Sequence, residues 1–185
     1  MKNDKFVSDT ETGGFDAQHD GLCSIAIKSF NMEPKLHLFI KPNPNLNYNP
    51  KALEVNGLTL EHLETVGISE EETINRIRTF FTEHLIEKPS IIGQNIQFDI
   101  KFLEALFVRN DAGRFSDLIN YHVIDTYPIT KALKDARKIQ IIDCKLGTAY
   151  THFTGKEPKN AHDAMADVLM TEELYNSQLK FLEGI

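Results

Sequence analysis

Apolar residues along this chain fall into short runs, which indicate strands, and into longer helical stripes. Three short apolar segments come first, and they predict three sequential antiparallel strands over residues 5–9, 22–30 and 36–40. A cluster of Pro and Asn over residues 41–50 predicts a loop. The amino-terminal part of the chain should therefore be a strand meander that ends in an irregular segment.

Helical patterns dominate the rest of the chain. Asn56-Gly57 predicts the end of a short helical turn, Thr59 should cap a second helix, and Ser69 precedes a third helix whose first turn holds three glutamates. Further strands are predicted over 90–93 and 121–124, and further helices over 98–108, 127–134, 146–153 and 161–179. Alternation of strand and helix after a meander predicts an α/β fold with a mixed sheet, whose parallel part runs through the first strand.

Length and composition add bounds to this picture. A chain of 185 residues with 41% hydrophobic content can form one domain, and we expect a single domain over 1–185. No apolar run resembles a signal peptide or a membrane span, so we expect a cytoplasmic protein that does not bind membranes. Cys23 and Cys144 lie far apart in apolar surroundings, which predicts small core residues rather than a disulfide or a zinc site.

The formal charge of −7 restricts the kind of nucleic-acid binding that is open to this chain. Sequence-independent binding to duplexes normally depends on many Lys and Arg contacts to phosphates. A nucleic-acid enzyme of this charge should therefore contact few phosphates, and mainly through metal ions.

Candidate chemistry begins at Asp9 and Glu11, an acidic pair at the predicted exit of the first strand. Residues i and i+2 of a strand point to the same face, so both carboxylates can converge on one cation. Two carboxylates this close repel each other unless positive charge lies between them. The alternative is that Asp9 ends the strand and Glu11 is solvated, and the pair alone does not decide between the two.

A third acid, Asp99, stands among apolar residues where a strand is predicted to lead into a helix. A desolvated carboxylate needs a cation or hydrogen-bond donors. Asp99 could therefore belong to a functional site at the end of the sheet, or it could cap the amino terminus of the helix.

The last predicted helix supplies Asp167 and His162. At about 100° per residue, Asp167 lies at the border of the apolar face and points toward the protein. His162 lies about 140° around the helix from Asp167, so the two cannot be paired ligands on one helical face. His162 could instead approach from or before the first turn as a proton-transfer residue, or it could be a solvated residue or a cap.

Asp125-Thr126 imitates Asp9-Thr10, because it also follows a predicted strand. It lacks a second acid two residues later, where Tyr127 stands. We therefore interpret Asp125 as a helix cap or as a residue that supports the site without entering it.

Three segments together resemble the motifs of the DEDDh exonucleases of the DnaQ-like family, which share a ribonuclease H-like fold. The three segments are Asp9-Thr10-Glu11-Thr12-Gly13, Asn95 to Asp99, and Ala161 to Asp167. They occur in the family's order, and the resemblance spans nearly the whole chain. Two positions depart from the family, which often has His at Gln94 and Glu at Ser24. The implied fold is α/β and ribonuclease H-like, with a mixed five-stranded sheet and helices on both faces.

The resemblance also implies a set of site residues. Asp9, Glu11 and Asp167 would bind one divalent cation, and Asp9 would bridge to a second cation supported by Asp99. The carboxylate ligands suit Mg or Mn. His162 would remove a proton from the attacking water, while the second cation would stabilise the departing 3'-oxygen. The residues in contact with the terminal nucleotide would be the main chain near Thr10 and the side chains of Asn95 and Phe98.

The implied activity is 3'-to-5' hydrolysis of single-stranded or frayed DNA to nucleoside 5'-monophosphates, in proofreading or repair. An RNA-trimming exonuclease is the close alternative, because contacts to the 2'-hydroxyl cannot be identified from the sequence. A non-catalytic polymerase-docking module is the third. The implied partners are a nucleic-acid 3' end, with DNA favoured, and a DNA polymerase subunit. We expect no long partner-binding tail beyond Ile185, so such docking should use the surface of the domain.

Overall fold

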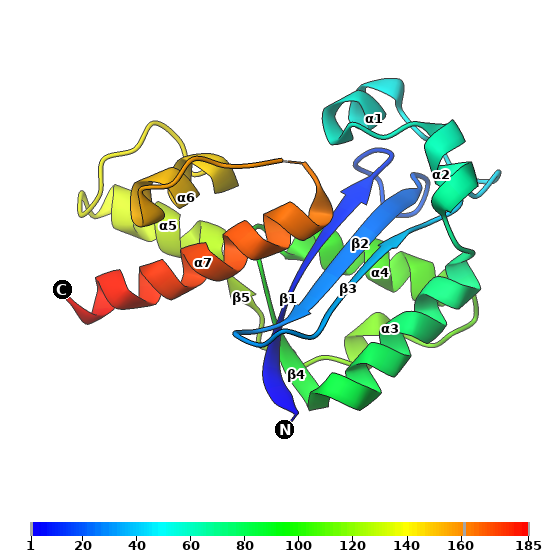
Figure 1. The fold of residues 1–185 in the computed structure, drawn as a ribbon, viewed down its shortest axis with the longest axis horizontal. Coiled ribbons are helices and arrows are strands. Elements are labelled where there is room, and N and C mark those ends of the chain that lie inside the picture. Colours follow the sequence, from blue (N-terminus) through cyan, green and yellow to red (C-terminus); the bar gives the residue numbers. More distant parts are fainter. Residues whose placement is uncertain (1, 161, 185) are drawn as a thin grey trace.

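Five strands form one mixed sheet in the order β3-β2-β1-β4-β5 (Figure 1). The computed structural model describes residues 2–160 and 162–184. The strands are β1 Asn3–Thr12, β2 Leu22–Ser29, β3 Lys35–Phe39, β4 Leu85–Gly93 and β5 Ile124–Asp125. The first three strands pair antiparallel, whereas β1–β4 and β4–β5 pair parallel. The predicted meander and the predicted parallel part through the first strand are both confirmed.

Three strand boundaries differ from the sequence prediction by three residues or more. β1 extends to Thr12, so Asp9 and Glu11 lie inside the strand and not at its exit. β4 begins at Leu85, before the apolar run that marked it, and β5 has only two residues at the end of the predicted 121–124. Pairing explains the first difference, because β2 continues opposite β1 as far as Thr12, whatever the polarity of the side chains.

Consecutive side chains of β1 serve opposite faces of the sheet. Phe6 belongs to the larger core, which includes α3 and α4, whereas Val7 packs with Ala164 and Val168 of α7. The same alternation places Thr10 on the α4 side, where it contacts Asp99, and places Asp9 and Glu11 on the side of α7. Helices therefore cover both faces, as expected.

The helices follow the predicted positions within a few residues. Their bounds are α1 Pro50–Asn56, α2 Leu60–Val66, α3 Glu70–His84, α4 Gln97–Arg109, α5 Thr126–Asp135, α6 Leu146–Thr154 and α7 Ala164–Glu183, with a 3₁₀ turn η1 at Phe115–Asp117. Thr59 caps α2 as predicted, and Ser69 caps α3; each side chain accepts a hydrogen bond from the main-chain N–H three residues later. Figure 1 shows α1 and α2 beyond the ends of β1 and β2, and α5 and α6 beside α7.

The last helix begins three residues later than predicted. Asn160 and His162 have φ angles of 52° and 69°, in the left-handed region that a right-handed helix excludes. Asp163 caps α7 instead, accepting the main-chain N–H of Ala166 at 2.9 Å. Ala161, the predicted first residue, lies outside the described residues.

Two further predictions concern the cysteines and the membrane. Cys23 and Cys144 are buried and free of disulfides, as predicted. Within the described ranges 2–160 and 162–184, no helix has the length and hydrophobicity that a membrane crossing requires.

Candidate active site

Three carboxylates converge between β1 and the first turn of α7. Ligand atoms of Asp9, Glu11 and Asp167 all lie within 4.8 Å of one another. Asp9 and Glu11 reach this point because they share one face of β1, and Asp167 because it lies one turn into α7. The predicted convergence of Asp9 and Glu11 is therefore confirmed, and α7 supplies the third carboxylate.

Asp99 approaches from the other side of β1, in the first turn of α4. Its Oδ1 accepts the main-chain N–H of Thr10 at 2.8 Å and the hydroxyl of Thr10 at 2.6 Å. The capping alternative is wrong, since α4 begins after Ile96 without a side-chain cap. Both hydrogen bonds fall on Oδ1, so Oδ2 keeps its lone pairs for another ligand.

Burial raises the pKa of all four carboxyl groups, and the charges of the other carboxylates in the set add to the shift at Asp9 and Glu11. Burial is the largest cause in each case, and it raises the pKa of Asp9 well above its usual range, with the charge of Asp99 next in importance. The pKa of Glu11 rises to about 8, where the charge of Asp167 adds to burial. Burial raises the pKa of Asp99 to about 7, against the hydrogen bonds from Thr10.

Asp167 differs from the other three because His162 lies nearby. Burial raises the pKa of Asp167 to about 6, whereas the charge and the main-chain N–H of His162 lower it. Its Oδ1 is buried and has no hydrogen-bond partner among the described residues. A buried carboxylate oxygen without a donor, close to two other carboxylates, fits a hard divalent cation bound by oxygen ligands. Asp9, Glu11 and Asp167 would hold that cation, and Asp99 lies close enough to affect the charge of Asp9.

His162 lies two residues before the start of α7. It therefore stands before the first helical turn, which is where a proton-transfer residue that approaches from outside the helix was expected. Its side chain is exposed, and its φ of 69° is uncommon for a residue with a Cβ. Left-handed backbone conformations at residues other than Gly are strained, and such strain is found at functional sites. The geometry therefore separates His162 from the convergent ligand set and leaves its ring accessible.

Asp163 and Ser24 also belong to this environment, although the sequence analysis assigned them no role. Besides capping α7, Asp163 raises the pKa of Asp9, Glu11 and Asp167 through its charge. Ser24 pairs with Glu11 in the β1–β2 register, and its buried hydroxyl has no partner within the described chain. An Asp directly before a helix is a cap pattern that the sequence shows. The closeness of Asp163 to the carboxylates of β1 depends on the fold and cannot be seen in the sequence.

An apolar hollow of about 430 Å³ adjoins the carboxylates. Thr10, Glu11 and Phe98 line it, so the predicted nucleotide-contacting Phe98 lies beside the acids. The remaining lining residues are Thr12, Gly14, Phe15, Asn49, Lys51, Ala52, Val55 and Asn56. α1 therefore forms one wall of the hollow.

Phe15 is a residue that the sequence analysis missed. Its side chain is 91% exposed, and its ring centroid lies 6.4 Å from that of Phe98. The loop that carries it is fixed by main-chain hydrogen bonds from Gly13 to Gly21 and from Gly21 to Asn47. An exposed aromatic ring on a fixed loop is available for stacking. In the sequence, the sign of this residue was an apolar side chain directly after a pair of glycines.

The other two predicted substrate residues lie at the site with different contacts. Both donor groups of Thr10 are used by Asp99, so Thr10 positions that carboxylate, and its contact with a nucleotide stays a prediction. Asn95 is exposed at φ 58°, and its main-chain N–H donates to Asp125 at 2.8 Å. Asp125 also caps α5 by accepting the N–H of Tyr127, which confirms its interpretation as a supporting cap.

Comparison with known proteins identifies the family of this chain. The family model described as Exonuclease, named RNase_T, matches residues 6–175. The chain therefore belongs to this exonuclease family, within the DnaQ-like superfamily, as the three motifs predicted. The family is one of nucleases, which are hydrolases.

Solved structures of exonuclease I share the fold. One superposes with a TM-score of 0.81 at 22% identity, covering 97% of this chain and 42% of that chain. The E. coli enzyme in complex with a dT13 oligonucleotide gives a TM-score of 0.80 at 22% identity, with the same coverage. A product-bound exonuclease I gives 0.78 at 22% identity and covers 100% of this chain and 46% of that chain. This chain thus spans less than half of their length, and the ribonuclease H-like fold class is confirmed.

Proposed function

We propose that this exonuclease acts in the 3'-to-5' direction on single-stranded or frayed DNA ends and releases nucleoside 5'-monophosphates. The observation that carries the proposal is the convergence of Asp9, Glu11 and Asp167 beside an apolar hollow that ends at Phe98 and Phe15. Carboxylates suit the ions of phosphodiester hydrolysis, and an apolar hollow beside them suits an unpaired base.

Each residue then has a defined task. Asp9, Glu11 and Asp167 bind divalent cations, Mg or Mn, and Asp99 contributes from the α4 side. Two bound cations would supply Lewis-acid stabilisation of the reacting phosphate and activation of the attacking water. His162, whose side chain is exposed, accepts the proton of that water.

Recognition of the end is assigned to the hollow. Phe98 and Phe15 contact the terminal bases, while Asn95 and the main chain near Thr10 contact the sugar and phosphate. Stacking on an aromatic ring requires a base that is free of its partner strand, which favours single strands and frayed ends. Exonuclease I, a structural neighbour, has been solved as an ssDNA complex, and this supports a DNA strand as substrate.

The test uses 5'-labelled DNA and RNA 20-mers of the same sequence, with MgCl₂ or MnCl₂. We expect a ladder that shortens from the 3' end, faster for DNA, and nucleoside 5'-monophosphates as products. Asp167→Ala and Asp9→Ala should abolish release without unfolding the chain. The matched control is Glu183→Gln, an exposed acid in the last turn of α7, about 24 Å along the helix from Asp167.

Three outcomes would contradict the proposal. Wild-type rates in either Asp variant would end the assignment of the metal ligands. Faster loss of RNA than DNA would make the protein an RNA-trimming enzyme. Absence of hydrolysis with either metal would favour a docking module, which a polymerase subunit would bind through the domain surface.

A further inference from the structure

Positive charge is concentrated in one segment of this acidic chain. Residues 131–159 contain seven basic and three acidic side chains, a formal charge of +4, whereas the remaining residues contain thirteen basic and twenty-four acidic ones. The segment covers the end of α5, the connection over 136–145, α6, and residues 155–159 after it. Its basic residues are Lys131, Lys134, Arg137, Lys138, Lys145, Lys156 and Lys159.

Three of these seven side chains are engaged by other groups of the protein. Lys131 pairs with Asp135 and Lys156 with Glu173, and the Nζ of Lys134 donates to a carbonyl at 2.8 Å. The other four are exposed and make no ion pair within the part of the chain that the structure describes. They are Arg137, Lys138, Lys145 and Lys159, which we call the basic surface.

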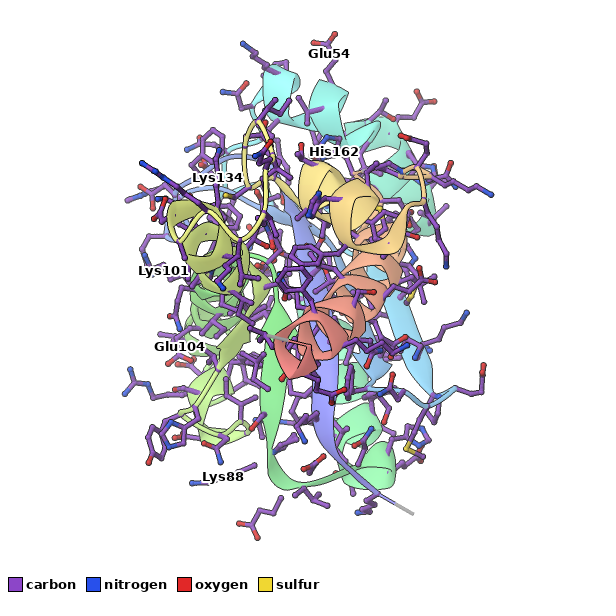
Figure 2. All side chains as sticks on the ribbon, turned by 90° about the vertical axis from the view of Figure 1, so that its left-hand side faces the viewer. Glu54, Lys88, Lys101, Glu104, Lys134 and His162 are labelled. Carbon is purple, nitrogen blue, oxygen red and sulfur yellow. The ribbon has the colours of Figure 1, made fainter. Side chains whose placement is uncertain are left out.

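The basic surface is connected to the active site at both ends of its segment. At one end, the carbonyl of Cys144, next to Lys145, accepts a hydrogen bond from the side-chain Nε2 of Gln94 at 2.9 Å. Gln94 directly precedes Asn95, one of the predicted substrate residues. Lys159 precedes His162 by three residues, so their Cα atoms are at most about 11 Å apart. Figure 2 faces α5, the connection and α6, with Lys134 and His162 both labelled on this side.

Apolar groups accompany these charges. A hollow of about 520 Å³ is lined by Lys134, Arg137 and the run 139–142, and Ile142 within it is 88% exposed. Single-stranded nucleic acid presents phosphates along one edge and apolar base faces along the other, and proteins bind it with basic grooves that also offer apolar contacts. The exposed Ile142 lines the same hollow as Arg137, so an apolar contact lies beside the positive charge.

We propose that the basic surface binds the phosphates of the single strand upstream of the nucleotide being removed. This inference rests on the proposed function, and it adds where the rest of the substrate lies. The remainder of the chain carries a large excess of acids, which repel a strand, so the strand is held where the charge is positive. An acidic protein is the competing ligand, and continuity with the active site favours the strand.

The experiment compares Arg137→Gln/Lys138→Gln/Lys145→Gln with the matched control Lys2→Gln/Lys35→Gln/Lys41→Gln. The control also removes three exposed charges, which lie outside residues 131–159. Binding of a 5'-fluorescein 20-mer is measured by anisotropy without metal, and kcat/KM is measured for the 20-mer and for a dinucleotide. Both are repeated from about 50 mM to 500 mM NaCl.

Each phosphate contact contributes about 0.7 to the slope of log K against log salt for a single strand. We expect the slope to fall by about 2 in the test variant and to stay unchanged in the control. The 20-mer should bind at least about 10-fold more weakly at 50 mM NaCl, and the difference should close toward 500 mM. Loss of kcat/KM should be large for the 20-mer and less than about 2-fold for the dinucleotide.

Failure of this inference can be told apart from failure of the proposed function. If the wild type degrades the 20-mer and the test variant keeps the control's slope, the basic surface does not bind the strand. If neither DNA nor RNA is degraded but the test variant still loses salt-dependent binding, the surface stands and the catalytic proposal fails. Displacement of the 20-mer by equimolar poly-glutamate would assign the surface to an acidic protein and overturn the inference.

Discussion

Replacing Glu11 with Gln should stabilise the metal-free protein above neutral pH. Glu11 is 7% exposed, and burial beside Asp167 and Asp99 raises its pKa from 4.5 to about 8. Below pH 4.5 the carboxyl is protonated in both the folded and the unfolded protein, so it does not lower the free energy of unfolding. Between pH 4.5 and 8 the unfolded chain ionises while the folded protein keeps the proton, so the free energy of unfolding falls as the pH rises.

The magnitude follows from the two pKa values. Each pH unit between them corresponds to about 1.4 kcal/mol, so the penalty at pH 8 reaches at most about 5 kcal/mol. Gln keeps the shape of the side chain but must itself be desolvated, so we expect a net gain of about 3 kcal/mol. For a chain of this length, that gain corresponds to a rise in Tm of about 6–12 °C.

Thermal unfolding in EDTA at pH 5 and pH 8 measures this effect. The gain for Glu11→Gln should be small at pH 5 and large at pH 8, while the control Glu183→Gln should change Tm by less than about 1 °C at both. Addition of MgCl₂ at pH 8 should raise the Tm of the wild type more than that of the variant, because the variant loses a ligand. Equal gains at the two pH values would refute the electrostatic reasoning, and so would a destabilised variant at pH 8.

Three other perturbations test separate parts of the structure. Thr10→Val removes the hydroxyl that donates to Asp99 and should lower kcat about 10-fold, whereas Thr10→Ser should retain activity; equal loss in both would exclude this positioning role. His162→Gln should lower kcat about 10²-fold and remove the acidic limb of the pH–rate profile while MgCl₂ still raises Tm; an unchanged profile from pH 6 to 9 would exclude His162 as the base. Phe107→Ala, in the core against Phe115, should cost about 3–5 kcal/mol of stability by urea unfolding and leave kcat at 20 °C within about 2-fold; a smaller cost would mean that the core collapses around the missing ring.

The strand-based part of the site was predictable because it depends on local geometry. Side chains two residues apart on a strand share a face, so Asp9 and Glu11 converge wherever β1 ends. The position of Asp167 on the inner side of α7 followed in the same way from helical periodicity. In both predictions, the direction of the side chain follows from the period of the strand or helix in which the residue lies.

The remaining features depend on contacts between distant segments. Asp99 is held by Thr10, 89 residues earlier, and no pattern near Asp99 distinguishes this contact from a helix cap. The extent of β1 was underestimated because pairing with β2 carries polar residues into the strand. The start of α7 was placed too early because left-handed backbone at His162 is set by the surrounding fold and not by residue type.

Because side chains alternate along β1, the catalytic carboxylates converge only when β1 and β2 pair in the correct register. Catalytic activity therefore reports on that register. A shift of one residue between β1 and β2 would turn Asp9 and Glu11 toward α4 and bring Thr10 to face α7. Such a molecule could be compact and rich in secondary structure, yet it would have no convergent carboxylates. Specific activity in a refolded preparation should therefore count the molecules with correct pairing of these two strands, which circular dichroism cannot distinguish from the rest.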